Sequence, residues 1–266
     1  MKSIFSGVLG RGASICLAVT TWAAQSTQLP GPKTDGSVLL PNEWSLHPVG
    51  QQIPLGDFPI NLAVHPRGRY AAVLHGGFSA HEIRVFDLKS ATLVTRSEIP
   101  ASFYGLEFSR DGRQLFCSGA SAEVVYAFEF AQGQLTNRRS IKVHDAKLRA
   151  VPAGLAVDAK AKRLFVANVW GDRVTRVDLA AEPKVSDILL GTNTSPLALA
   201  PVTASPNFED AMATKREEAS FYLTTPGDTF PYTCRLDEKR ERLYVSLWAQ
   251  AAVAVIDLKS SQVIAR

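Results

Sequence analysis

The side chains that could carry out chemistry in this sequence are few and scattered. The five histidines are His47, His65, His75, His81 and His144. Only His75 and His81 are close enough in the sequence to share one loop, with Glu82 next to the second of them. A zinc site needs about three or four ligands at compatible spacing, and no further ligand stands near these. We therefore expect a polar loop here, with no metal and no cofactor.

Sequence motifs for nucleophilic, phosphate-binding and zinc chemistry do not occur. The chain has no G-x-S-x-G, Walker, H-E-x-x-H or paired-cysteine motif, so we predict no catalytic residue. Acidic residues do recur at regular spacing, as Asp87, Glu129, Asp178 and Asp257. An acid that recurs in every repeat is best explained as a turn former whose carboxylate accepts hydrogen bonds from nearby backbone amides.

A set of aromatic and polar residues is the better candidate for a binding site. The predicted ligand-binding residues are His75, Tyr104, Asn168, Trp170, Tyr232 and Trp248. Each stands near the start of an expected first strand or the end of an expected second strand. For Trp170 and Trp248 there is an alternative, because large aromatic side chains at such positions could instead pack between neighbouring repeats.

These residues belong to a pattern that occurs four times. Its anchors, which open a basic turn in each repeat, are His65, Ser109, Asp158 and Asp237. An apolar strand ends just before each anchor, a second follows the turn, and a third ends in the recurring acid. A fourth strand is expected over 92–99 and again over 261–266. Four short strands in a repeat of about 40 to 50 residues are typical of one β-propeller blade.

We therefore predict an all-β fold, a β-propeller of four-stranded blades. In a blade the first strand runs away from one rim and the second returns to it, so the predicted binding residues should surround one mouth of a central channel. Residues 44–56 have the character of an outer strand but no partner among the four visible blades. We expect these blades to be part of a seven-bladed ring with more blades beyond Arg266; the alternative is a closed four-bladed ring.

Three segments complete the predicted domain organisation. Residues 1–24 have a positive start, an apolar run and small residues, which are typical of a secretory signal peptide, with a buried N-terminal helix as the alternative. Residues 25–43 are expected to be a linker, and 44–266 the blades. An insertion with a short helix is expected over 192–228, where the interval between anchors is longest. We predict a periplasmic or secreted protein without a membrane span.

Charge and cysteine content restrict the partners and the chemistry. The net charge of +4 falls to about +2 if Lys2 and Arg11 leave with the signal peptide, which is too little for a nucleic-acid partner. Cys117 and Cys234 could pair in an oxidising compartment. However, Cys117 stands where the other repeats have valine, so we favour buried free cysteines.

The blade pattern resembles a known family. The segments 164–168 (LFVAN) and 243–246 (LYVS) are similar to the signature strand of the YVTN-repeat, or YncE-like, β-propellers. Longer segments, such as VANVWGDRVTRVDLA and YVSLWAQAAVAVIDL, resemble bacterial proteins in which such a propeller is covalently fused to a phosphoesterase domain of the alkaline-phosphatase type. The metal-binding carboxylates and nucleophile of that domain have no counterparts here, so the resemblance implies no phosphoesterase activity for these residues.

Two functions remain. We predict an exported scaffold that binds a small molecule or a protein at one propeller face, as the propeller part of a larger phosphoesterase-containing protein. The alternative is a lactonase-like hydrolase acting at the propeller mouth, since similar propellers include enzymes that hydrolyse sugar lactones. The predicted mouth carries mostly aromatic side chains, which favours binding over catalysis.

Overall fold

The computed structural model describes residues 28–160, 162–191 and 228–266. The chain divides into two compact units, one ending at Gln52 and one spanning Ile53–Arg266. The expected signal peptide and nearly all of the expected insertion, with its helix, lie outside the described residues. The helical segments that are described are short 3-10 turns, and none of them is long or apolar enough to cross a membrane.

The described part of the first unit is a small antiparallel sheet. Its strands are β1 (Gly31–Pro32), β2 (Val38–Leu39) and β3 (Ser45–Leu46), which pair in chain order. Leu46, in the segment 44–56 that was expected to be an outer blade strand, pairs with Val38 in this sheet. The partner blade expected for this segment beyond Arg266 stays a prediction. Both residues of β3 are exposed.

The described residues of the second unit form four antiparallel sheets, each of four strands. Blade one has β4 (Pro59–Val64), β5 (Tyr70–His75), β6 (Glu82–Asp87) and β7 (Thr92–Glu98). Blade two has β8 (Leu106–Phe108), β9 (Gln114–Ser118), β10 (Val124–Ala131) and β11 (Gln134–Lys142). Blade three has β12 (Pro152–Val157), β13 (Arg163–Asn168), β14 (Arg173–Asp178) and β15 (Lys184–Leu189). Blade four has β16 (Pro231–Asp237), β17 (Arg242–Leu247), β18 (Ala252–Asp257) and β19 (Gln262–Ala265). The predicted all-β fold of four-stranded blades is confirmed.

Two of the recurring acids hold the turn that follows the third strand. Asp87 accepts a hydrogen bond from the amide of Lys89 at 2.9 Å, and Asp257 accepts one from the amide of Ser260 at 2.9 Å. Such bonds satisfy backbone groups that the ladder leaves free. The other two recurring acids accept side-chain hydrogen bonds instead, so the predicted turn-forming role is confirmed for Asp87 and Asp257.

Apolar second strands join consecutive blades. At the interface of blades three and four, Phe165 and Ala167 share a core with Leu243 and Val245. Blade three uses alternate residues of its second strand for its two neighbours, Leu164 and Val166 toward blade two and Phe165 and Ala167 toward blade four, as the two-residue period of a strand requires. A fully buried side chain such as Phe165 stabilises the fold by roughly 1.5–3 kcal/mol. The packing of such side chains between blades therefore stabilises the unit.

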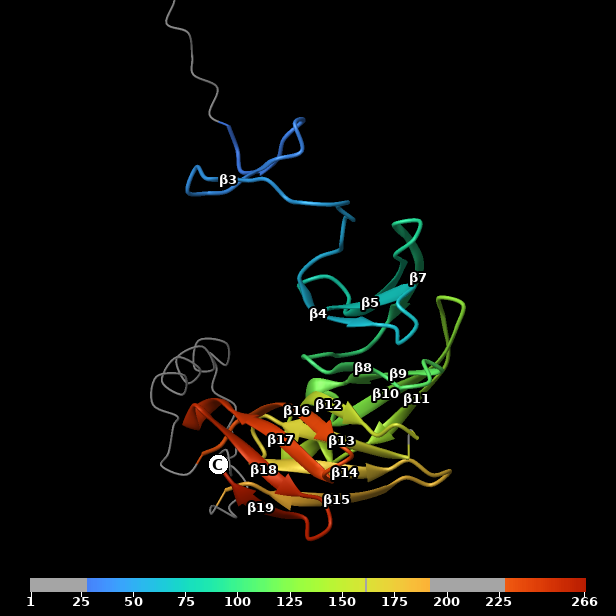
Figure 1. Cartoon of the computed structure of the whole chain (residues 1–266), viewed down its shortest axis with the longest axis vertical. Helices are drawn as coiled ribbons and strands as arrows, with labels where there is room; N and C mark the ends of the chain where they lie inside the picture. Colours follow the sequence, from blue (N-terminus) through green and yellow to red (C-terminus); the bar gives the residue numbers. More distant parts are fainter. Residues whose placement is uncertain (1–27, 161, 192–227) are drawn as a thin grey trace, which may run out of the picture. The chain divides into compact units, whose positions relative to one another are not determined.

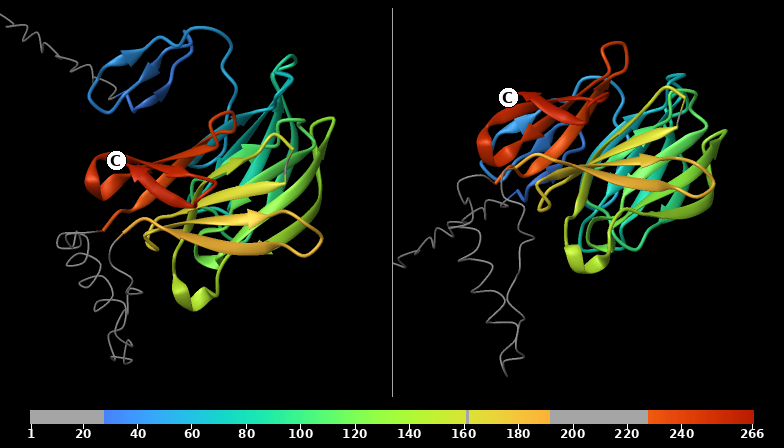
Figure 2. Two further views of the ribbon diagram at one scale, coloured as in Figure 1. Left: turned by 60° about the horizontal axis from the view of Figure 1, so that its bottom comes forward. Right: turned by 90° about the horizontal axis from the view of Figure 1, so that it is seen from below.

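The four first strands approach one another closely. β4 lies against β8, β8 against β12, and β12 against β16, so the blades follow one another in chain order (Figure 1, Figure 2). Two glycines permit this approach, because a Cβ at Gly105 would collide with the carbonyl of Ala153, and one at Gly154 with the backbone of Thr233. The close approach of these strands places their side chains around a common space.

Candidate functional site

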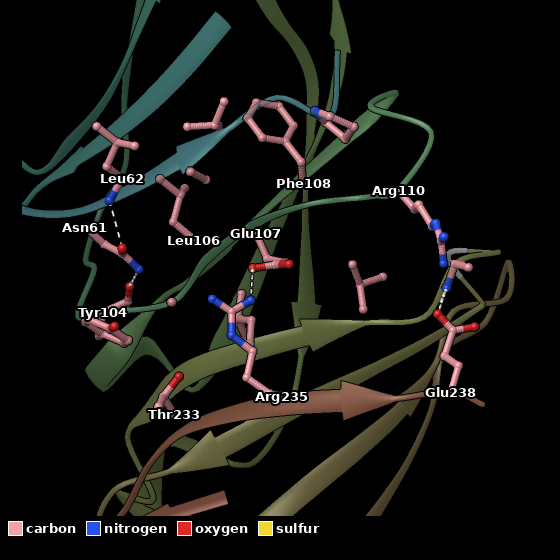
Figure 3. Close-up of a pocket in the computed structure, with 17 residues that line it drawn as sticks. Asn61, Leu62, Tyr104, Leu106, Glu107, Phe108, Arg110, Thr233, Arg235 and Glu238 are labelled. Atoms are coloured by element: carbon pink, nitrogen blue, oxygen red, sulfur yellow. Dashed lines mark hydrogen bonds and ion pairs between the residues drawn. The ribbon is translucent and has the colours of Figure 1, made fainter. Parts of the chain in front are cut away.

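A pocket of about 410 Å³ lies along the first strands of all four blades. This volume is within the range of about 300–1,000 Å³ that is usual for small-molecule sites. From one end to the other its polar lining residues are Asn61, Tyr104, Thr233, Glu107, Arg235, Arg110 and Glu238 (Figure 3). The pocket is thus polar along its length, with apolar strand residues between the polar ones.

Glu107 of β8 and Arg235 of β16 face each other near the middle of the pocket (Figure 3). The distance from Oε2 of Glu107 to NH1 of Arg235 is 3.8 Å, and their side chains are 32% and 79% exposed. An ion pair this open to solvent contributes at most about 1 kcal/mol. Either group can therefore leave this ion pair and contact a ligand instead, at little cost in free energy.

The surroundings of Glu107 change its acidity. Burial raises the pKa of its carboxyl, and the nearby charge of Arg235 opposes that rise. A carboxyl with a raised pKa in a pocket is suited to take up and release a proton in a reaction. Arg235, by contrast, stays charged and can stabilise negative charge.

An aromatic cluster lies at one end of the pocket. The rings of Tyr104 and Tyr232 are 4.7 Å apart between centroids, and Phe103 lies 5.8 Å from Tyr232. Burial and the neighbouring Tyr104 raise the pKa of Tyr232. Asn61 links two blades here, since its Nδ2 donates to the carbonyl oxygen of Tyr104 at 2.7 Å. Tyr104 and Tyr232, both predicted from the sequence, are thus brought together beside the pocket.

His75 and Asn168 occupy buried positions at the ends of their strands. Nε2 of His75 accepts a hydrogen bond from the amide of Gly56 at 3.2 Å, and burial together with Arg84 lowers its pKa. Nδ2 of Asn168 donates to Oγ1 of Thr175 at 2.9 Å. Neither residue lines the pocket, and their predicted ligand contact stays a prediction.

Trp170 lies in the turn after the second strand of blade three, and Trp248 begins the short 3-10 turn η3 (Trp248–Gln250) after the second strand of blade four. Their exposed fractions are 53% and 77%, so neither is packed between blades in the part of the chain that the structure describes. Trp248 is held beside Phe230, with ring centroids 6.5 Å apart and a hydrogen bond from its amide to the Phe230 carbonyl oxygen. Two exposed tryptophans leave a binding role open, and that role also stays a prediction.

The loop with His81 and Glu82 uses its polar groups internally. Nδ1 of His81 lies 2.8 Å from Oγ of Ser102, and the carboxylate of Glu82 pairs with Arg84 at 2.6 Å and with Arg96 at 2.8 Å. Within the described ranges no group of three or more His, Cys, Asp or Glu side chains is placed to hold a metal ion.

The sequence analysis did not identify Glu107 and Arg235. Both stand two residues before an anchor, where blades one and three have Ala63 and Ala156. Ala156 packs into the core against blade four, whereas the two charged side chains reach the pocket. The sequence did contain a signal for them: a charged residue stands at a position where the other two repeats have alanine.

Sheets of four antiparallel strands with a pocket along the first strands define the protein as a β-propeller. Residues 62–201, about half of the chain, match the family model described as the SMP-30/gluconolactonase/LRE-like region. The chain belongs to this family. No curated protein sequence matches it.

Solved structures with a similar fold are distant in sequence. The β-propeller domain of Cps50 (Swd1) from Myceliophteria thermophila superposes with a TM-score of 0.55 at 12% identity, covering 80% of this chain and 58% of that one. Hydrazine synthase from Kuenenia stuttgartiensis gives 0.53 at 16%, covering 83% and 64%. A protein from Lactobacillus plantarum gives 0.53 at 10%, covering 83% and 57%. The chain thus spans less than two thirds of these proteins, and the similarity concerns the fold alone.

Proposed function

We propose that this protein binds small polyhydroxylated lactones in the pocket along its first strands and hydrolyses them. The observation that carries the proposal is the placement of Glu107 opposite Arg235 across the pocket, 3.8 Å apart. Membership of a family whose model includes gluconolactonases supports the substrate class. The amide, phenol and hydroxyl groups at one end of the pocket suit the hydroxyl groups of such a ligand.

The pocket offers the two groups that ester hydrolysis needs. In its ionised form Glu107 takes a proton from water as the water oxygen bonds to the lactone carbonyl carbon. The guanidinium of Arg235 stabilises the negative charge that develops on the carbonyl oxygen. The ring C–O bond then breaks, and the proton passes from Glu107 to the leaving alkoxide, giving the open hydroxy acid.

Hydrolysis of glucono-δ-lactone tests the proposal. We expect the purified protein to exceed the buffer rate and Glu107→Gln to lower kcat/KM by about 100-fold or more, the usual contribution of a general base. The control is Glu129→Gln. It removes an exposed carboxylate on β10 of blade two, outside the pocket lining, and should leave the rate unchanged. A rate equal to buffer, or one that Glu107→Gln does not reduce, would contradict the proposal.

A second candidate is an exported scaffold that binds its ligand or partner at the rim, as the propeller part of a longer protein with a phosphoesterase domain. The exposure of Trp170 and Trp248 favours it, as does the resemblance of their segments to such fused proteins. Replacing both tryptophans by alanine should then abolish binding of this rim ligand or partner, while the melting temperature of the protein stays nearly constant. If binding survives both changes, the rim is not the site.

A further inference from the structure

A cluster of charged and polar side chains joins blades two and three at a distance from the pocket. Nδ1 of His144, just after β11, is 3.3 Å from Oε2 of Glu123, and its Nε2 is 3.0 Å from Oδ1 of Asp187. The side chain of His144 is 7% exposed and that of Glu123 is fully buried. Glu123 and His144 belong to blade two and Asp187 to β15 of blade three. The imidazole therefore connects the two blades.

Both carboxylates are fixed by other partners. Oδ1 of Asp187 accepts from Oγ1 of Thr175 at 2.7 Å, and its Oδ2 pairs with Arg173 at 2.9 Å. Although burial opposes it, the hydrogen bonds from His144, Thr175 and Arg173 hold the pKa of Asp187 at about 2. Oε1 of Glu123 accepts from the amide of Val151 at 2.8 Å. Neither carboxylate is free to turn away from the imidazole.

The groups around His144 favour its protonated form. Oγ1 of Thr175 also lies 3.0 Å from Nε2, but its hydroxyl donates to Asp187 at 2.7 Å and so is not the donor that a neutral Nε2 would need. A neutral imidazole has a single N–H and would turn a bare nitrogen lone pair toward one of the two carboxylates. If that carboxylate were Glu123, its fully buried Oε2 would face a lone pair and have no donor, which is unfavourable. The imidazolium carries an N–H on each nitrogen, so it can donate to Asp187 from Nε2 and form an ion pair with Glu123 at 3.3 Å from Nδ1.

We propose that His144 is held as an imidazolium between Glu123 and Asp187, that it clamps blade two to blade three, and that raising the pH loosens this interface by removing its proton. Two more charged groups, Lys142 and Asp145, stand near it on its own segment and pair with each other at 3.5 Å. Arg173 lies on the facing strand β14. Its guanidinium pairs with Asp187, so its positive charge is not directed at the imidazolium.

The expected pH dependence has a definite sign. Burial alone would lower the pKa of His144, but the hydrogen bonds to Asp187 and Glu123 raise it above the ordinary value of 6.5. A group whose folded-state pKa is raised stabilises the fold fully below its unfolded pKa and loses that effect as the pH rises through the folded value. The clamp is therefore closed in mild acid and weakened in mild base.

The first test is a histidine titration of the full chain by NMR, with the ring nitrogens labelled and the His144 signals assigned by their loss in His144→Asn. We expect both ring nitrogens of His144 to show imidazolium shifts at neutral pH and a midpoint above 6.5. A midpoint at or below the ordinary histidine value would overturn the proposal.

The second test measures urea unfolding of the full chain at about pH 6 and about pH 9. The unfolding equilibrium constant of the wild type should rise about tenfold for each pH unit between the unfolded and folded pKa of His144. The His144→Asn variant should lose this pH-dependent rise in the unfolding equilibrium constant. The His47→Asn variant, changed at an exposed position in the first unit, should keep it. The same pH dependence in His144→Asn as in the wild type would contradict the clamp.

Discussion

Charged side chains in the blades differ in how tightly they are held, and this difference separates structural from functional ones. Glu82 is buried and pairs with Arg84 and Arg96 at 2.6 and 2.8 Å. Glu107 meets Arg235 at only 3.8 Å, in a pocket. A buried, fully paired carboxylate stabilises a fold but has no capacity left for a ligand. Glu107 keeps that capacity.

The raised pKa of Glu107 predicts how activity changes with pH. As a general base Glu107 acts when ionised, so kcat/KM should rise with pH through its raised pKa. Arg235→Gln removes the charge that opposes the rise, so the ascending limb should move to higher pH as well as to lower rates. The measurement is the pH profile of kcat/KM for both proteins. A limb that moves to lower pH in the variant would contradict the assignment of Glu107.

Buried cysteines give a second prediction at the scale of residues. Cys117 and Cys234 are free and buried in separate cores, in agreement with the arrangement that the repeat pattern favoured. Burial raises the pKa of Cys234 to about 12 and that of Cys117 further, so neither forms a reactive thiolate near neutral pH. A thiol reagent should label neither in the native protein and both after unfolding. Rapid native labelling, or no labelling after unfolding, would show the arrangement to be wrong.

Among the elements, the first strands depend on two glycines for their approach. Gly154→Ala would place its Cβ against the backbone of Tyr232 and Thr233, which cannot move as a side-chain end can. We expect a loss of about 1–3 kcal/mol in the free energy of unfolding, measured by urea denaturation.

Gly76→Ala is the matched control for this change. The nearest atoms to its new Cβ would be side-chain ends, Cδ1 of Ile60 at 3.1 Å and Oγ of Ser102 at 3.4 Å, which can give way. Its effect on stability should be small. Equal effects of the two substitutions would mean that close strand approach does not limit stability.

The strands could be predicted because each carries its own signal, whereas the site is assembled from separate blades. The anchors Ser109 and Asp158 mark turns, and the apolar runs after them mark second strands, so their positions follow from local chemistry. The contact of Glu107 with Arg235 joins residues more than a hundred positions apart, and no local pattern indicates it.

At the scale of the whole molecule, the last blade has a face that no described blade covers. Tyr244 holds the position that Ala72, Phe116 and Phe165 hold in the other blades, where each is buried. On blade four Tyr244 is 36% exposed, and Val253 is exposed beside it on the neighbouring strand. These apolar side chains suit cover by further β-structure. The larger ring expected from the sequence stays a prediction.

The most direct test of the central claim is a crystal structure of the protein with gluconate, the open product of the proposed reaction. We predict its hydroxyl chain between Asn61 and Thr233 and its carboxylate at the guanidinium of Arg235, next to Glu107. Gluconate bound instead at Trp170 and Trp248, with none along the first strands, would contradict the account.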